Sequence, residues 1–330
     1  MPALLEIDGL EVTFAGEAGL VPAVRGVSLE VDRGEMVALV GESGSGKSVT
    51  ALAVLRLLPE PPARITGGRI LFDGVDLLRL GEEPMRRLRG RRIGMIFQEP
   101  MTSLNPLLSV GRQLTEAMEV HLGISRRQAE RRAVELLEAV GIPDPEGRLR
   151  QYPHQLSGGM RQRVMIAIAL CCEPDLVIAD EPTTALDVTI QAQILEVMQD
   201  LCARLGVALL LITHNLAIVA RYAHRVNVMY AGRVVESGEA VALYRRPAHP
   251  YTLGLLESVP RLDRPRGAPL EPIPGSPPDP AALPSGCAFR PRCRLARPRC
   301  AEAVPDPVPI EPGHRSACFE YRRLRAEATA

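Results

Sequence analysis

The chain has 330 residues, of which 46% are hydrophobic, and its formal net charge is zero. This length suits one large domain or two unequal ones, with enough apolar side chains for a sizeable core. Because the charges balance, nothing global favours nucleic acid or an acidic membrane surface as a partner. Glu6 and Asp8 interrupt the stretch where an export signal needs apolar residues, so we expect none. The longest apolar runs, such as 207–212, are far shorter than the roughly 18–20 residues that span a bilayer.

Alternating apolar residues and turn residues predict short strands in the first hundred residues. We expect these strands at 4–14, 21–31, 35–40, 69–72 and 93–97. We expect the first two to form an antiparallel pair at the start of the chain. The third leads through a Gly/Ser loop into a helix over 47–58. We interpret the basic run 85–92 as a solvated face and not as a nucleic-acid patch.

The middle of the chain predicts a helical insertion followed by more α/β structure. Apolar residues at three and four spacing indicate helices over about 110–150. From 158 to 236, buried strands at 176–179 and 208–212 alternate with helices, as in a largely parallel sheet.

The C-terminal segment has a different composition. Of the chain's 30 prolines, 15 lie between Pro260 and Pro312. This density excludes long helices and central strands. We therefore expect an irregular appendage that is held by something other than a hydrophobic core.

Residues 41–48, Gly-Glu-Ser-Gly-Ser-Gly-Lys-Ser, fit the phosphate-loop pattern G-x-x-x-x-G-K-[ST] between a strand and a helix. In such a loop, backbone N–H groups and the helix N-terminus converge on phosphate oxygens. Lys47 would reach the β and γ phosphates, and the Ser48 hydroxyl would ligate Mg²⁺. A flexible Gly/Ser turn is the alternative, which the flanking strand and helix disfavour. The residues expected to hold ATP here are Gly41, Ser43, Gly44, Ser45, Gly46, Lys47, Ser48 and Val49.

Lysine usage supports this prediction. Of the 39 basic side chains, only Lys47 is a lysine, and a lysine placed at random would fall on this position about one time in 39. A compact ammonium can enter a loop wrapped around phosphate, whereas a planar guanidinium fork cannot.

Residues 176–181, Leu-Val-Ile-Ala-Asp-Glu, form a strand that ends in two acids, where a phosphate-loop enzyme has its Walker B element. Asp180 would hold Mg²⁺, directly or through water. Glu181 would polarise the attacking water as a general base, which implies hydrolysis and not binding alone. Acids at a strand end are often only a turn or a cap, but the phosphate loop upstream favours the catalytic interpretation.

Residues 156–162, Leu-Ser-Gly-Gly-Met-Arg-Gln, resemble the signature of the ABC ATPases. The Ser-Gly-Gly turn opens a helix and forms a second anion-binding N-terminus, which suggests a head-to-tail dimer that closes over ATP. Ser157 and Gly159 are the contacting positions, and Met160 replaces the usual Gln without affecting them. Ser157 also serves as a helix cap, but a cap alone does not explain the double glycine.

The ABC resemblance covers nearly all of residues 1–240. It implies a P-loop NTPase core of α/β class, with a mixed sheet, an antiparallel N-terminal subdomain, an α-helical insertion and a Pro-rich, Cys-containing appendage. The corresponding boundaries are 1–98 and 161–245 for the ATP-binding core, 99–160 for the helical subdomain and 246–330 for the C-terminal domain.

Further site residues follow from the same resemblance. Gln98 matches the Q-loop glutamine, which touches Mg²⁺ and water and links the site to membrane subunits. Residues 185–187, Ala-Leu-Asp, match the D-loop and bring in Asp187. His214 matches the switch histidine on the γ phosphate, although alone it would be an ordinary strand-end histidine. Phe14 resembles the aromatic that stacks on adenine, with a core Phe as the alternative.

Two stretches indicate the branch of the family. Residues 97–106, Phe-Gln-Glu-Pro-Met-Thr-Ser-Leu-Asn-Pro, resemble the Q-loop stretch of the oligopeptide, dipeptide and nickel importer ATPases. The C-terminal stretch 249–252, His-Pro-Tyr-Thr, resembles the same branch. This likeness implies a second ATPase subunit, two membrane permeases and an extracytoplasmic solute-binding protein, with no nucleic acid. The chain would lie at the cytoplasmic side of the inner membrane. Nickel or another small solute is the alternative cargo, and a soluble non-transport ABC ATPase is the more distant alternative.

Four cysteines lie in the Pro-rich tail: Cys287, Cys293, Cys300 and Cys318. Disulfides do not suit a cytosolic ATPase, so the thiolates would hold a structural Zn²⁺ or an iron–sulfur cluster. The wide spacings favour a [4Fe–4S] cluster, and some members of the importer branch have a similar tail. The other three cysteines, at 171, 172 and 202, lie in apolar helical stretches and are expected in the core.

Overall fold

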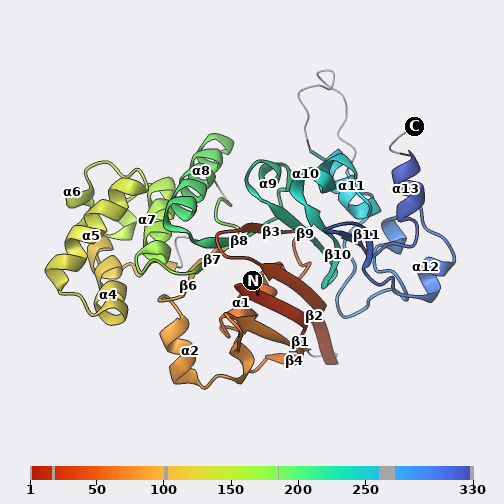
Figure 1. The fold of residues 1–330 in the computed structure, drawn as a ribbon, viewed down its shortest axis with the longest axis horizontal. Coiled ribbons are helices and arrows are strands. Elements are labelled where there is room, and N and C mark those ends of the chain that lie inside the picture. Colours follow the sequence, from red (N-terminus) through yellow and green to blue (C-terminus); the bar gives the residue numbers. More distant parts are fainter. Residues whose placement is uncertain (1, 17–18, 100–102, 185, 260–271, 328–330) are drawn as a thin grey trace. The chain divides into compact units, whose positions relative to one another are not determined.

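The computed structural model of the chain describes residues 2–16, 19–99, 103–184, 186–259 and 272–327. The chain divides into two compact units. Figure 1 labels the helices and strands of the chain. The first unit comprises Met1–Leu5, Val31–Met36 and Phe72–Ile212, and the second comprises Glu6–Glu30, Val37–Leu71 and Thr213–Ala330. Residues 100–102 of the importer-like stretch and Ala185 of the D-loop lie outside the described residues. The domain boundaries given above stay a prediction.

A parallel sheet forms the centre of the first unit. Its strands are β6 (Ile93–Ile96), β7 (Leu176–Asp180) and β8 (Ala208–Thr213), and β7 pairs in parallel with both of the others. Every residue of β7 and β8 is buried. Continuous apolar strands of this kind fit a parallel sheet covered on both faces, so the predicted strands are confirmed.

Helices make up most of the remaining first unit, and the predicted helical insertion is confirmed. The helices of the first unit are α2 (Glu82–Leu88), α4 (Val110–Leu122), α5 (Arg126–Ala139), α6 (Pro145–Leu149), α7 (Gly158–Leu170) and α8 (Val188–Leu205). The unit also contains the short elements β5 (Val75–Asp76), η1 (Leu77–Arg79) and η2 (Pro153–Gln155). Ser125 and Gln128 form a capping box that starts α5. Leu114 and Met118 of α4 and Ala133 of α5 are fully buried, which joins the helices through their apolar faces.

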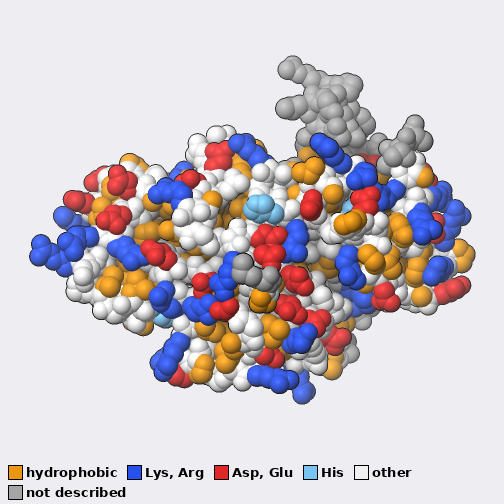
Figure 2. Space-filling view, viewed as in Figure 1, with side chains coloured by type: hydrophobic (Ala, Val, Ile, Leu, Met, Phe, Trp, Pro, Cys, Tyr) orange, Lys and Arg blue, Asp and Glu red, His pale blue; other side chains and the backbone are white. Residues whose placement is uncertain are grey.

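The basic run 85–92 is neutralised by nearby carboxylates. Arg86 lies 2.8 Å from Glu83, and Arg92 lies 2.8 Å from Asp73 and 2.6 Å from Asp175. Figure 2 shows basic and acidic side chains interspersed on the face in view. These pairs support the interpretation of the run as a solvated, ion-paired face.

The second unit begins with the N-terminal strands. They are β1 (Leu5–Gly16), β2 (Gly19–Val31) and β4 (Ala63–Phe72), and β1 lies between the other two. The helix after the Gly/Ser loop, α1 (Lys47–Val54), is shorter than the predicted 47–58. Its end has a physical cause, because Arg56 adopts a left-handed conformation with φ 51°, which a helix cannot continue through.

The larger sheet of the second unit includes strands from the C-terminal tail. Its strands are β3 (Met36–Val40), β9 (Arg225–Tyr230), β10 (Arg233–Glu239), β11 (Val308–Glu311) and β12 (His314–Ser316). β9 lies parallel to β3 and antiparallel to β10, β10 pairs with β12, and β12 pairs with β11. Accompanying helices are α9 (Leu216–Tyr222), α10 (Ala240–Arg245), α11 (Pro250–Glu257), η3 (Arg290–Arg292), α12 (Arg299–Glu302) and α13 (Tyr321–Glu327).

The expectation that the tail lacks a hydrophobic core is wrong. Phe289, Leu295 and Leu324 are at most 4% exposed. Phe289 also lies 5.2 Å from the ring of Tyr230 and 5.4 Å from that of Tyr251, measured between ring centroids. The prolines permit this because they fall mainly outside strands, and Pro309 is on β11, an outer strand that tolerates proline.

A buried carboxylate ties three segments of the second unit together. Glu236 on β10 is 1% exposed and accepts hydrogen bonds from the backbone N–H groups of Ala248 (2.7 Å) and His249 (2.9 Å). Its other contact is His314 Nε2 on β12, at 2.8 Å. Buried polar groups are tolerated when they are hydrogen-bonded in this way.

Cys171, Cys172 and Cys202 are buried, as predicted. Within the described residues, no helix has the length and apolar character needed to cross a membrane.

His249 makes the stability of the second unit depend on pH. Burial lowers its pKa from 6.5 to about 3, and Nδ1 accepts a hydrogen bond from the N–H of Tyr251 at 3.1 Å. The unfolded chain takes up a proton below pH 6.5 that the folded chain refuses until about pH 3. Stability is therefore fully present above pH 6.5 and falls by about 1.4 kcal/mol per pH unit below it.

A His249→Asn variant tests this because asparagine keeps an acceptor at the start of α11 but does not titrate. We expect urea unfolding from pH 7 to pH 4.5 to show a shallower loss of stability in the variant than in the wild type. Parallel curves would exclude His249 as the group responsible.

Candidate functional site

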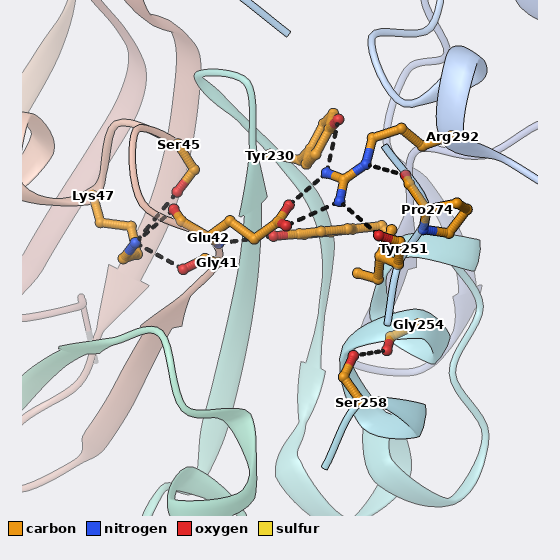
Figure 3. Close-up of polar contacts among 11 residues, drawn as sticks. Gly41, Glu42, Ser45, Lys47, Tyr230, Tyr251, Gly254, Ser258, Pro274 and Arg292 are labelled. Carbon is orange, nitrogen blue, oxygen red and sulfur yellow. Dashed lines mark hydrogen bonds and ion pairs between the residues drawn. The ribbon is translucent and has the colours of Figure 1, made fainter. Parts of the chain in front are cut away.

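The phosphate loop encloses the ammonium group of Lys47. Lys47 Nζ donates to the carbonyl oxygens of Gly41 (2.8 Å) and Glu42 (3.0 Å) and lies 3.5 Å from Ser45 Oγ (Figure 3). Lys47 is 4% exposed. The loop thus presents a single buried cation among backbone groups, which is the arrangement that binds phosphate.

Glycines are required at two positions of this loop by close packing. A Cβ at Gly41 would lie 2.2 Å from the carbonyl oxygen of Met229 on β9, and one at Gly46 would lie 2.6 Å from that of Ala23 on β2. Gly46 also has φ 103° and caps α1 without any side-chain hydrogen bond. The glycine pattern therefore follows from the backbone fold.

The tail motif 249–252 contacts the phosphate loop, a role that the sequence did not predict. Tyr251 on α11 is fully buried, and its Oη accepts a hydrogen bond from the backbone N–H of Glu42 at 2.8 Å (Figure 3). Arg292 contacts the side chain of the same Glu42. In the sequence, the only signal for this contact is the resemblance of His-Pro-Tyr-Thr to an importer feature.

In the first unit, the structure brings Gln98 and Glu181 together. Glu181 Oε2 accepts hydrogen bonds from Thr184 Oγ1 at 2.8 Å and from Gln98 Nε2 at 3.2 Å. Glu181 has φ 46°, a left-handed conformation that costs energy in a residue with a side chain and is typical of functional sites. Asp180, at the end of β7, is 5% exposed. Thr184 was missed because nothing in the sequence distinguishes it from a turn residue.

Two predicted site residues cap helices in the first unit. Ser157 Oγ accepts from the N–H of Met160 at 3.4 Å, and Asp187 Oδ1 accepts from the N–H of Ile190 at 3.0 Å. A Cβ at Gly159 would lie 3.5 Å from Ile190 Cγ2, an ordinary contact. The described packing therefore does not itself require glycine at position 159.

The remaining predicted ATP residues occupy the expected elements. Phe14 is half-buried on β1, and His214 is exposed directly after β8. Ser43 and Gly44 are exposed in the loop, whereas Ser48 and Val49 are half-buried at the start of α1. The individual roles of these residues stay predictions.

The tail cysteines share one cavity but do not form a metal-binding group. All four line one small pocket, with a volume of about 20 Å³ for water-sized probes, and all are free thiols. Burial raises the pKa of Cys293 to about 11 and that of Cys318 to about 12, so these thiols are protonated at neutral pH. Among the described residues, no three His, Cys, Asp or Glu side chains are placed to hold a metal ion. The predicted Zn²⁺ or iron–sulfur site is thus not supported by this geometry.

Comparison with known proteins identifies the family. A family profile described as "ABC transporter" matches residues 24–184. A putative peptide import ATP-binding protein of Brucella melitensis is 54% identical over 98% of both chains. The chain belongs to the ABC transporter family. The dipeptide transport ATP-binding protein DppD of Bacillus subtilis is another relative of this ABC ATPase, 51% identical over 97% of this chain and 96% of that one.

Solved structures agree with this assignment. The ATP-binding cassette MJ0796, described as a dimer in a post-hydrolysis state bound to ADP and Pi, has a TM-score of 0.65 and 26% identity. The match covers 72% of this chain and 98% of that cassette.

A second profile, "Oligopeptide/dipeptide transporter, C-terminal region", matches residues 235–300. The predicted ABC fold is confirmed, and the chain is an ABC ATPase that couples ATP hydrolysis to transport.

Tyr251→Phe tests the contact between α11 and the phosphate loop. The variant keeps the ring but leaves the N–H of Glu42 without its acceptor, so we expect a loss of about 1–3 kcal/mol in the free energy of unfolding. Tyr152→Phe, on a ring that is 41% exposed, is the control and should stay within about 0.5 kcal/mol of the wild type. Equal effects in the two variants would contradict this role of Tyr251.

Proposed function

We propose that this ABC ATPase energises an importer of di- or oligopeptides. Its relatives are named as peptide import and dipeptide transport ATP-binding proteins, and the tail matches the oligopeptide/dipeptide transporter C-terminal profile. The subunit pairs with a second ATPase, drives two permeases at the cytoplasmic side of the membrane and serves an extracytoplasmic solute-binding protein. The observation that carries the proposal is the 54% identity to a putative peptide import protein over 98% of both chains.

The phosphate loop supplies ATP binding. Lys47 exchanges its contacts with the carbonyl oxygens of Gly41 and Glu42 for the β and γ phosphates. The adenine stacks on Phe14, and His214 contacts the γ phosphate. Because the ammonium is already held inside the loop, little rearrangement is needed when the triphosphate enters.

Hydrolysis depends on Glu181. Its carboxylate polarises the attacking water, and the hydrogen bonds from Thr184 and Gln98 fix its orientation. Oxygen donors from Ser48, Asp180 and Gln98 suit Mg²⁺, a hard cation, and would hold it. When bound, Mg²⁺ neutralises charge on the phosphates.

The signature turn at Ser157 and Gly159 serves the partner subunit. Since the described packing does not demand glycine at 159, close approach of another molecule is the better reason for it. The N-terminus of α7 then faces ATP held by the partner ATPase, and Asp187 of the D-loop lies at the same interface.

The four tail cysteines are proposed to bind a [4Fe–4S] cluster, with a structural Zn²⁺ as the alternative. Cys287, Cys293, Cys300 and Cys318 would hold the cluster and supply its thiolate ligands. The four free thiols line one pocket, but no three of them are placed for a metal ion, so the proposal rests on the cysteine spacing and on the resemblance to importer tails. Binding would release protons from thiols whose pKa is raised.

Glu181→Gln tests the catalytic role. The amide still accepts a hydrogen bond from Thr184 but is a poor base, so we expect kcat to fall at least about 100-fold with ATP binding unchanged. Phosphate release by the chain with its partner subunit and binding of a fluorescent ATP analogue measure the two. The exposed Glu135→Gln is the matched control. Hydrolysis by the Glu181 variant at the wild-type rate would sink the assignment.

Metal analysis tests the cysteine proposal. Anaerobically purified protein should contain about four irons per chain and absorb broadly near 400 nm. A Cys287→Ser, Cys293→Ser double variant should lose both signals, whereas Cys202→Ala, a change in the buried core, should retain them. Colourless protein with one zinc would favour the alternative, and protein without metal would exclude both.

A further inference from the structure

The phosphate loop contains one acidic residue, and a cation from the tail is bound to it. Arg292 Nη1 lies 2.7 Å from Glu42 Oε2, and Arg292 Nη2 lies 3.0 Å from Oε1 (Figure 3). This is a bidentate pair, the strongest form of contact between guanidinium and carboxylate. The two residues are 250 positions apart in sequence, and both belong to the second unit.

Arg292 is fixed by the tail as well as by Glu42. Its Nε donates to the carbonyl oxygen of Pro274 at 2.9 Å, and the guanidinium lies 5.9 Å from the ring centroids of Tyr230 and Phe289. The Arg292 side chain is 4% exposed. Burial lowers its pKa, but the hydrogen bonds to Glu42 and Tyr230 outweigh this and raise it. The cation is therefore permanent and held in one place.

A second stretch of the tail lies along the same part of the loop. Loop residues 42–45 line a pocket together with Pro277, Pro278, Pro280 and Leu283 of the tail. The tail thus contacts the phosphate loop directly through the Arg292–Glu42 ion pair and the hydroxyl of Tyr251, and its apolar side chains share a pocket with the loop. The phosphate loop and the tail are therefore joined by direct polar contacts.

The charge of Glu42 gives this packing a functional consequence. Glu42 is next to the loop residues proposed to bind phosphate, and an unpaired carboxylate there would repel the triphosphate. Since its side chain is only 28% exposed, water screens that charge incompletely. Arg292 cancels the charge and holds the carboxylate against the tail.

We infer that Arg292 is a positioning residue for the phosphate loop, through which the C-terminal tail sets the affinity of the subunit for ATP. The inference rests on the proposed binding of ATP by this loop. Arg292 acts through Glu42 and does not itself touch the nucleotide. A purely structural role is the alternative, in which loss of Arg292 would only loosen the tail.

A double-mutant comparison separates the two roles. Arg292→Gln leaves the Glu42 charge uncancelled, so KM for ATP should rise about tenfold while kcat changes less than about threefold. Adding Glu42→Gln removes that charge, so the double variant should return to within about threefold of the wild-type KM. Glu42→Gln alone should not raise KM. Arg297→Gln, an exposed arginine of the same tail, is the control and should match the wild type.

The measurements use the full chain with its partner subunit, with ATP turnover and fluorescent-analogue binding as readouts and thermal unfolding as the check of folding. An unchanged KM in Arg292→Gln, or a double variant as weak as that single variant, would overturn the inference. If Arg292→Gln does not fold, Arg292→Lys decides, because it keeps the charge without the fork and should raise KM about threefold. A wild-type chain that fails to bind ATP would instead refute the proposed function.

Discussion

Close packing of the phosphate loop against β9 is the constraint on which the second unit depends. With 2.2 Å between a Cβ at Gly41 and the carbonyl oxygen of Met229, only glycine lets the loop approach the strand and close around Lys47. β9 pairs in turn with β10, and β10 pairs with β12 of the tail. The geometry of the loop is therefore set by a strand whose far neighbours come from the last thirty residues or so of the chain.

Local patterns in the sequence predicted most of the elements. The apolar runs of β3, β7 and β8 and the loop between Gly41 and Ser48 each carry their signal within a few neighbouring residues. The site contact between Gln98 and Glu181 was accessible only through family resemblance, because the two residues are 83 positions apart. The motifs marked which residues belong to the site, and the fold supplied how they meet.

Long-range contacts within the tail were not predictable. High proline density correctly excluded long helices, but the aromatic cluster of Tyr230, Tyr251 and Phe289 draws on segments that the sequence does not connect. Arg292 carries no local mark either, since nearly all the basic side chains of the chain are arginines. The four tail cysteines, in contrast, do have a sequence signal, because their spacing suggests metal ligands. That spacing does not determine how the thiols are placed relative to one another.

The pairing of β10 with β12 also bears on how such a cassette can be divided. Ending the chain directly after β10, at Glu239, would remove β12 and leave the backbone of β10 as an open sheet edge. Exposed edges of this kind recruit strands from other molecules and lead to aggregation. By pairing with β10, the tail strand β12 covers an edge that would otherwise be open to strands of other molecules.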